Sequence, residues 1–279
     1  MADRTFLNAR FVVGAGSFGF IVVMAVCGGW VTPYDGNAQD LMSALDPPSL
    51  AAGGHLLGTD QLGRDILARM ISGARISLLI ATSVVVLSGV VGTLLGAVSG
   101  YWGGMRDVVL QKLVETFWAF PPILLALTIM AFFGQSLTNI IIAIAIQRWI
   151  PYCRIARAQA LVLSTRDFIA ASRIMGARTG WIVRRHILPN ILSSAIVIAT
   201  FSMATAILAE ASLSFLGLGV PATIASWGGM LAEGRSYIVE AWWIAVFPGL
   251  GIVMTVMGLN LLGDWLRDQL DPKTTLNLR

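Results

Sequence analysis

The sequence has few charged residues for its length. Charged residues make up 12% of the 279 positions and hydrophobic residues 56%, whereas soluble proteins average about 25% charged. The mean hydropathy is +0.77. A soluble all-α protein would show a polar face on each helix, and most of the apolar segments here show none. The composition therefore predicts an all-α integral membrane protein.

Cysteine and histidine are also scarce, which limits the chemistry. Cys27 in the first apolar run and Cys153 in a basic segment provide no disulfide framework. His55 and His186 are expected on opposite sides of the membrane, so neither a zinc set nor an intramembrane serine–histidine pair can assemble. We therefore expect no catalytic, cofactor-binding or metal site.

Nucleotide-binding motifs are absent from the sequence. It contains no G-x-x-x-x-G-K-[ST], and no G-x-G-x-x-G opens a helix after a strand. We expect that the chain does not hydrolyse ATP itself. The net charge of +4 is explained by where the basic residues fall along the chain, so we expect no nucleic-acid partner.

Long apolar runs predict six transmembrane helices, since about 20 residues cross roughly 30 Å of hydrocarbon. Only Gly134-Gln-Ser136 separates the third from the fourth, so one broken helix and five spans remain the alternative. The first run, from Phe11 to Tyr34, is longer than the core of a signal peptide, which favours a retained helix. The six candidates cover 11–33, 76–100, 117–134, 137–150 with its flanks, 191–211 and 242–263.

The distribution of charge predicts the orientation. Lysine and arginine in short loops mark the cytoplasmic side, and with six spans and an internal N-terminus 15 of the 19 basic residues are cytoplasmic. We expect both termini in the cytoplasm. The expected divisions are a cytoplasmic tail (1–10), a first span with an external segment (11–75), a core transmembrane domain (76–272) and a second cytoplasmic tail (273–279).

Two external segments are expected. In the first, apolar residues recur at helical spacing from Leu62 to Ile71, after a turn in which Thr59 or Asp60 caps the helix. This helix either lies on the membrane surface or leads into the second span. The second segment, 212–240, is rich in glycine and tryptophan, which predicts a loop at the interface. That loop either caps the bundle or contacts a soluble partner.

Glu210 is the main ionisable residue predicted inside a span. Such residues are costly in lipid and are often functional. Together with Ser202 and Thr205 it either lines a polar pathway or is hydrated at the interface.

A basic segment from Arg148 to Asn190 interrupts the apolar second half, with eight arginines against one acid, Asp167. Ser164-Thr-Arg-Asp167 resembles a capping box, and Gly176 is suited to end the helix that follows. Pro189 is expected near the start of the fifth span. These signals predict a short helix, a glycine turn and a second helix that bind lipid headgroups or a cytosolic partner. One narrow face of the short helix holds Phe168, Ala171, Ser172 and Met175.

This segment resembles the cytoplasmic loop of ABC importer permeases, whose pattern is E-A-A, three residues, G, nine residues, I-x-L-P. Anchored on Gly176 and Leu188-Pro189, the E-A-A core falls on Ala170-Ala171-Ser172, and His186 stands at the isoleucine position. Ala170 replaces the glutamate, which removes any salt bridge that the acid would make.

Three other stretches are similar to the second permease subunit of dipeptide, oligopeptide and nickel importers. They begin at His55-Leu-Leu-Gly-Thr-Asp60, Ala209-Glu-Ala-Ser-Leu-Ser-Phe215 and Asn260-Leu-Leu-Gly-Asp-Trp265. The resemblance implies a six-span, type I importer permease in the bacterial plasma (inner) membrane. Its implied partners are a second, different permease subunit, two cytosolic ATP-binding subunits, an external solute-binding protein and membrane lipid.

The resemblance also implies that the short helix docks in a cleft of one ATP-binding subunit. The alternative is a stand-alone channel or secondary transporter, which the scarcity of intramembrane charge disfavours. The substrate class stays open among dipeptides, oligopeptides, glutathione, opines and chelated nickel. The implied ATPase-coupling residues are Asp167, Phe168, Ala170, Ala171, Ser172, Arg173, Met175 and Gly176.

Overall fold

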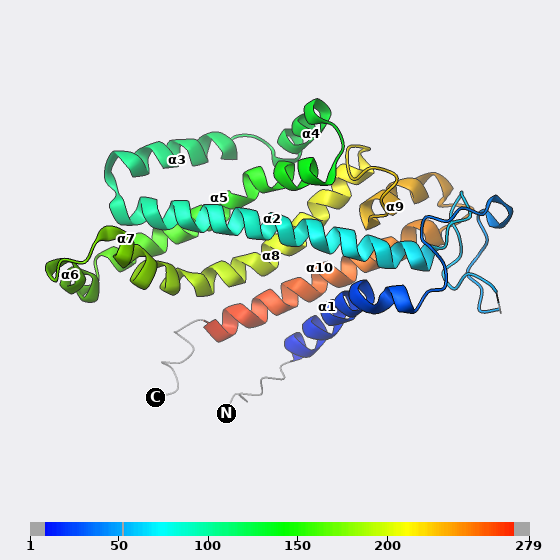
Figure 1. Ribbon diagram of the computed structural model, residues 1–279, viewed down its shortest axis with the longest axis horizontal. Helices are drawn as coiled ribbons and strands as arrows, with labels where there is room; N and C mark the ends of the chain where they lie inside the picture. The colour runs from blue at the N-terminus through cyan, green and yellow to red at the C-terminus, as the bar shows by residue number, and fades with distance from the viewer. Residues whose placement is uncertain (1–8, 52, 271–279) are drawn as a thin grey trace.

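A computed structural model describes residues 9–51 and 53–270, and this part of the chain is helical, without β-sheet. Most of the tail 1–10 and all of the tail 273–279 lie outside the described residues. The helices form one elongated bundle (Figure 1). They are α1 (Ala9–Cys27), η1 (Gly28–Trp30), η2 (Leu41–Ser43), α2 (Ile66–Trp102), α3 (Gly104–Trp118), α4 (Pro122–Phe133), α5 (Leu137–Ser164), α6 (Asp167–Ile174), α7 (Thr179–Ile182), η3 (Val183–Ile187), α8 (Leu188–Phe215), α9 (Trp227–Gly234), η4 (Arg235–Tyr237) and α10 (Trp243–Leu270).

Four described helical segments are long and apolar enough to cross a membrane. They cover 9–30, 66–102, 179–215 and 243–270, and the bent pair of α3 and α4 raises the number to five. Helix α5 is long as well, with 28 residues, but polar side chains such as Gln147 and Arg148 lower its hydropathy.

The prediction of one continuous span over 117–134 is wrong. The chain breaks between Trp118 and Pro122, where α3 and α4 meet at 83°. Pro121 and Pro122 lack the amide hydrogens that would continue α3, and the backbone of Pro121 is extended, at φ −57° and ψ 126°. The Gln147 amide secures the bend by donating to the carbonyls of Phe117 and Phe120 at 3.3 and 3.0 Å.

The basic segment from Arg148 is not a polar loop either, because α5 continues to Ser164. Its arginines have partners within the bundle. The Arg154 guanidinium lies 4.4 Å from the Trp118 ring centroid, and Arg157 makes two 2.6 Å hydrogen bonds to Asp107. Cys153, expected in the loop, is buried in this helix.

Helices α2 and α5 approach each other closely along a row of glycines. Gly92, Gly96 and Gly100 are spaced one helical turn apart on α2. A Cβ atom at Gly96 would collide with the carbonyl oxygen of Cys153, and the other two would collide with carbonyl oxygens one turn away on α5. Small residues permit this contact in lipid, where van der Waals packing drives helix association.

We expect Gly96→Leu to destabilise the folded chain by about 1–3 kcal/mol, because the larger side chain must push α5 away. Gly19→Leu in α1 is the matched control, since no atom lies within 4 Å of a Cβ built at Gly19. Thermal unfolding of both variants in detergent measures the difference. Equal midpoints would show that the contact between α2 and α5 tolerates a side chain.

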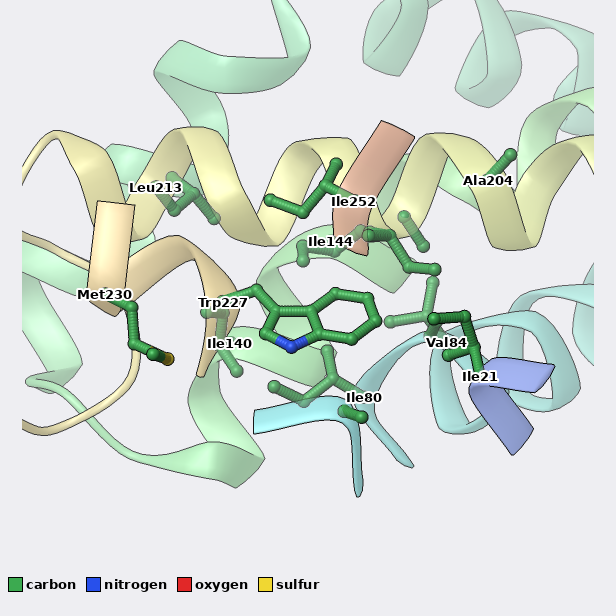
Figure 2. Close-up of a cluster of buried hydrophobic side chains, with 14 of the residues drawn as sticks. Ile21, Ile80, Val84, Ile140, Ile144, Ala204, Leu213, Trp227, Met230 and Ile252 are labelled. Atoms are coloured by element: carbon green, nitrogen blue, oxygen red, sulfur yellow. The ribbon is translucent and has the colours of Figure 1, made fainter. Parts of the chain in front are cut away.

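Trp227 of α9 packs against several helices of the bundle. The sequence predicted tryptophans at a wet interface, but the side chain of Trp227 is fully buried. Figure 2 shows its ring among side chains that include Ile80, Ile140 and Ile252. Its indole nitrogen donates to the Met70 carbonyl at 3.0 Å. The segment 212–240 therefore holds a helix, α9, that caps the bundle.

The helix expected at 62–71 is the beginning of a span. Helix α2 starts at Ile66 and continues to Trp102, so of the two alternatives the separate surface helix is wrong and the lead-in to the second span is confirmed. The N-cap is Asp65, which accepts from the Ala68 amide at 2.7 Å. Asp60 instead accepts from the amides of Leu62 and Arg64, at 2.8 and 3.0 Å, within the preceding turn.

A buried ionic cluster attaches the segment between η1 and α2 to the bundle. Arg64 contacts Asp60 at 2.6 Å and Glu233 of α9 at 2.9 Å. Arg69 of α2 pairs with the same two acids. Pairing offsets the cost of removing these charges from water, and the cluster connects the stretch from Asp60 to Arg69 with Glu233, which is distant in sequence.

Candidate functional site

Helix α6 lies at one end of the bundle, and the segment between η1 and α2 lies with α9 at the other (Figure 1). The predicted glycine turn after this helix is confirmed. Gly176 has φ +80°, and its amide donates to the Arg173 carbonyl while the Ala177 amide donates to the Ser172 carbonyl, each at 3.0 Å. This pair of bonds satisfies the last carbonyls of the helix.

The predicted capping box at the start of this helix is wrong. Ser164 ends α5, and its hydroxyl donates to the Leu161 carbonyl at 2.7 Å. Arg166 occupies the N-cap position without a side-chain hydrogen bond. Asp167 lies in the first turn of α6, where a negative charge is favourable beside the free amides.

One buried side chain attaches α6 to the bundle. Ile169 is 0% exposed and packs in a cluster with Ala97 of α2, Ala160 of α5 and Ile187 of η3. Arg173 adds a polar contact, because its Nε donates to the Tyr101 hydroxyl at 3.0 Å and its guanidinium lies over that ring. Ile169 therefore joins α6 to three long helical segments.

The opposite side of α6 is open. Phe168, Ala170, Ala171 and Met175 are exposed and Ser172 is half-buried. Ile174 and Met175 are each 87% exposed. A groove runs alongside, between α6 and α7, and Ser172, Met175, Gly176, Ala177, Arg178 and Trp181 line it.

His186 and Trp181 also belong to this surface, although neither was among the predicted coupling residues. The His186 ring centroid lies 5.7 Å from that of Phe168 and 5.1 Å from that of Trp181. Its Nε2 is 3.4 Å from the Ser172 hydroxyl. The histidine therefore fills the space between α6 and α7, at the position where the importer pattern has an isoleucine.

The chain continues from this surface into a long helix without a break. Residues 179–215 form one helical segment, which includes a π-helical turn, η3, just before Pro189. Proline cannot donate to the carbonyl four residues earlier, and a wider turn relieves that conflict. The fifth span was predicted to start at residue 191, but that residue lies inside the helical segment 179–215.

The three predicted pathway residues lie on α8 in different environments. Thr205 lines an open cavity of about 530 Å³ between α3, α4, α5 and α8. Ser202 is buried outside that lining. Glu210 is 1% exposed and accepts from Ser214 at 2.8 Å and Ser77 at 3.4 Å, so the expectation that it is hydrated at the interface is wrong.

No group of three His, Cys, Asp or Glu residues that could hold a metal ion occurs within 9–51 and 53–270.

We expect Ile169→Ser to weaken the attachment of α6 by about 2–5 kcal/mol, because it empties a buried site and adds a hydroxyl. Ile174→Ser changes the same residue type on the exposed side and should stay within about 0.5 kcal/mol of the parent. Hydrogen exchange of the amides from 165 to 187 measures the difference. Unchanged protection in Ile169→Ser would contradict the anchoring role.

Two family models match this chain. Residues 92–276 match the family described as binding-protein-dependent transport system inner membrane component. Residues 3–48 match the N-terminal TM domain of oligopeptide transport permease C.

Curated relatives align over nearly the whole chain. The di/tripeptide transport system permease protein DppC of Pseudomonas aeruginosa is 43% identical over 97% of this chain and 90% of its own length. The oligopeptide transport system permease protein OppC of Bacillus subtilis is 40% identical, over 95% and 86%. The glutathione transport system permease protein GsiD of Pectobacterium atrosepticum is 40% identical, over 97% and 89%.

These matches agree with the apolar helices of the bundle and with the absence of a nucleotide motif from the sequence. The chain therefore belongs to the family of binding-protein-dependent transport system inner membrane components, as a multi-pass permease subunit of the peptide ABC importer class.

Proposed function

We infer that the chain is one of two different permease subunits that together enclose the pathway of an ATP-driven importer. Two cytosolic ATP-binding subunits supply the energy, and an external solute-binding protein delivers the substrate. The observation that carries this proposal is α6, which is fixed to the bundle by Ile169 and presents exposed apolar side chains at the end of the molecule.

In this proposal α6 is the coupling helix. Phe168, Ile174 and Met175 are the side chains available to enter a cleft on an ATP-binding subunit, because they are exposed. Ala170 provides no charge at the glutamate position of the family pattern, so docking depends on shape and apolar contact. Closure of the ATP-binding subunits would move α6, and Ile169 and Arg173 would carry that movement to the helices behind it.

We propose six spans, formed by α1, α2, the bent pair α3–α4, α5, the 179–215 segment and α10. An even number is supported by Arg10 and Asp268, which are 3.4 Å apart at the beginning of α1 and near the end of α10. The concentration of arginine around α6 makes that end cytoplasmic, and both termini fall on the same side. The external segment and α9 then face the solute-binding protein.

The substrate class is proposed from the names of the relatives. Those named above are di/tripeptide, oligopeptide and glutathione permeases. We propose that this chain serves peptides or related small solutes, and that Ser202, Thr205 and Glu210 lie on the α8 side of their pathway.

Gly176→Trp and Ala171→Glu should each uncouple transport, since both alter the docking surface without changing the membrane-facing side chains. We expect substrate-stimulated ATP turnover of the reconstituted complex to fall at least about tenfold. Gly134→Trp is the matched control, because Gly134 also has φ +80° in open space but lies after α4. Normal stimulation in the two α6 variants would contradict the coupling assignment.

A separate reconstitution distinguishes the importer from a stand-alone channel or secondary transporter. Vesicles that contain this chain only, without ATP, should take up no peptide. Uptake under those conditions would favour the stand-alone alternative.

Thr179→Cys should resist a membrane-impermeant thiol reagent added outside intact cells and react after the cells are opened, because it lies beside α6. Met42→Cys, which replaces a side chain that is 95% exposed in the external segment, is the control that should react from outside. Both variants are made with Cys27 and Cys153 replaced by alanine. Labelling of Thr179→Cys from outside would overturn the orientation.

A further inference from the structure

The cavity between α3, α4, α5 and α8 contains one charged side chain, Arg148, among its described lining residues. Arg148 lies near the middle of α5, about 17 Å along the helix from Leu137. One terminal nitrogen of its guanidinium donates to the Thr205 carbonyl of α8 at 3.3 Å. The rest of the lining is mainly apolar and includes Phe117, Trp118 and Phe120.

The positive charge has no acidic partner within the described residues. The ion pairs found in 9–51 and 53–270 do not involve Arg148. Glu210, on the same helix as Thr205, is outside the cavity lining and accepts from Ser214. Arginine does not lose its proton in proteins, and a charge at this depth is expensive unless something compensates it.

A hydrogen-bond acceptor lies next to this charge. Pro151 also lines the cavity, and it has no amide hydrogen to donate to the Gln147 carbonyl one turn earlier. The wall of α5 therefore offers a cation and, beside it, a backbone carbonyl without its usual helical donor. This combination matches a carboxylate with a neighbouring N–H group.

We propose that Arg148 binds the carboxylate of the transported solute, at the C-terminus of a peptide. A free peptide always has this group whatever its side chains, and the apolar walls around Arg148 accept side chains of different shape. A guanidinium holds a carboxylate through two parallel hydrogen bonds, which a lysine ammonium cannot reproduce. The proposal rests on the importer function and assigns the contact that its permease makes with the solute.

The test uses the full four-subunit complex with its binding protein in liposomes, and dialanine as the transported probe. Arg148→Met should assemble and hydrolyse ATP on addition of loaded binding protein, yet take up at least about tenfold less dialanine per ATP. Arg148→Lys, which keeps the charge, should retain more uptake than Arg148→Met. Arg106→Met is the matched control at an exposed arginine on α3 and should behave as the parent.

Two results would overturn the proposal. Undiminished uptake per ATP in Arg148→Met would show that the charge does not contact the solute. Loss of co-purification with the second permease subunit in Arg148→Met, but not in Arg106→Met, would show that Arg148 neutralises an acid of that subunit. An absence of ATP-dependent uptake in the parent complex would instead refute the proposed function, so the two failures are distinguishable.

A second measurement tests whether the cavity is positively charged. In a chain without Cys27 and Cys153, Thr205→Cys is treated with an anionic and a cationic methanethiosulfonate reagent. We expect the anionic reagent to react several-fold faster relative to the cationic one, and Arg148→Met to remove this preference. Equal ratios with and without Arg148, or no reaction with either reagent, would overturn the proposal, because a cavity that admits a peptide must admit these reagents.

Discussion

The structure depends on the close contact between α2 and α5. Three glycines of α2 lie directly against backbone carbonyls of α5, and no residue with a side chain would permit that distance. In lipid there is little hydrophobic gain from joining two apolar helices, so the energy comes from backbone proximity and packing. The long helices form a scaffold on which the bent α3–α4 pair, α8 and α6 are mounted.

Both ends of the molecule are attached to this scaffold by different chemistry. At the end with α9, buried arginines of α2 and the preceding turn pair with Asp60 and Glu233, which attaches the segment between η1 and α2 to the bundle. At the other end the contacts are mainly apolar, through Ile169 and the alanines of α2 and α5. At the end with α9 the charged side chains pair with one another, whereas α6 keeps an exposed apolar side.

Several features could be predicted from single residues and their immediate neighbours. Gly176 ends α6 because only the local backbone decides that turn, and the apolar runs identified α1, α2, α8 and α10 because hydropathy is summed along the chain. The break at Pro121-Pro122 also has a local cause, yet the window that indicated a span over 117–134 averaged across it.

Other features depended on contacts between residues that are distant in the sequence. The arginines of α5 resembled a solvated loop, but Arg154 and Arg157 are satisfied by Trp118 and Asp107, about 35 and 50 residues away, so the helix continues through them. Trp227 resembled an interfacial residue, but its side chain is fully buried and its indole nitrogen donates to the Met70 carbonyl of α2.

By itself the sequence determined the membrane class, the small exposed helix with its glycine turn, and the absence of a nucleotide-binding motif, since each follows from composition or from a few adjacent residues. Only the tertiary structure decided that Arg148 faces a cavity beside Thr205, that Glu210 is enclosed by serines, and that Ile169 rather than a capping box holds α6. Burial and charge compensation are properties of contacts between distant segments, and those contacts exist only once the helices have packed.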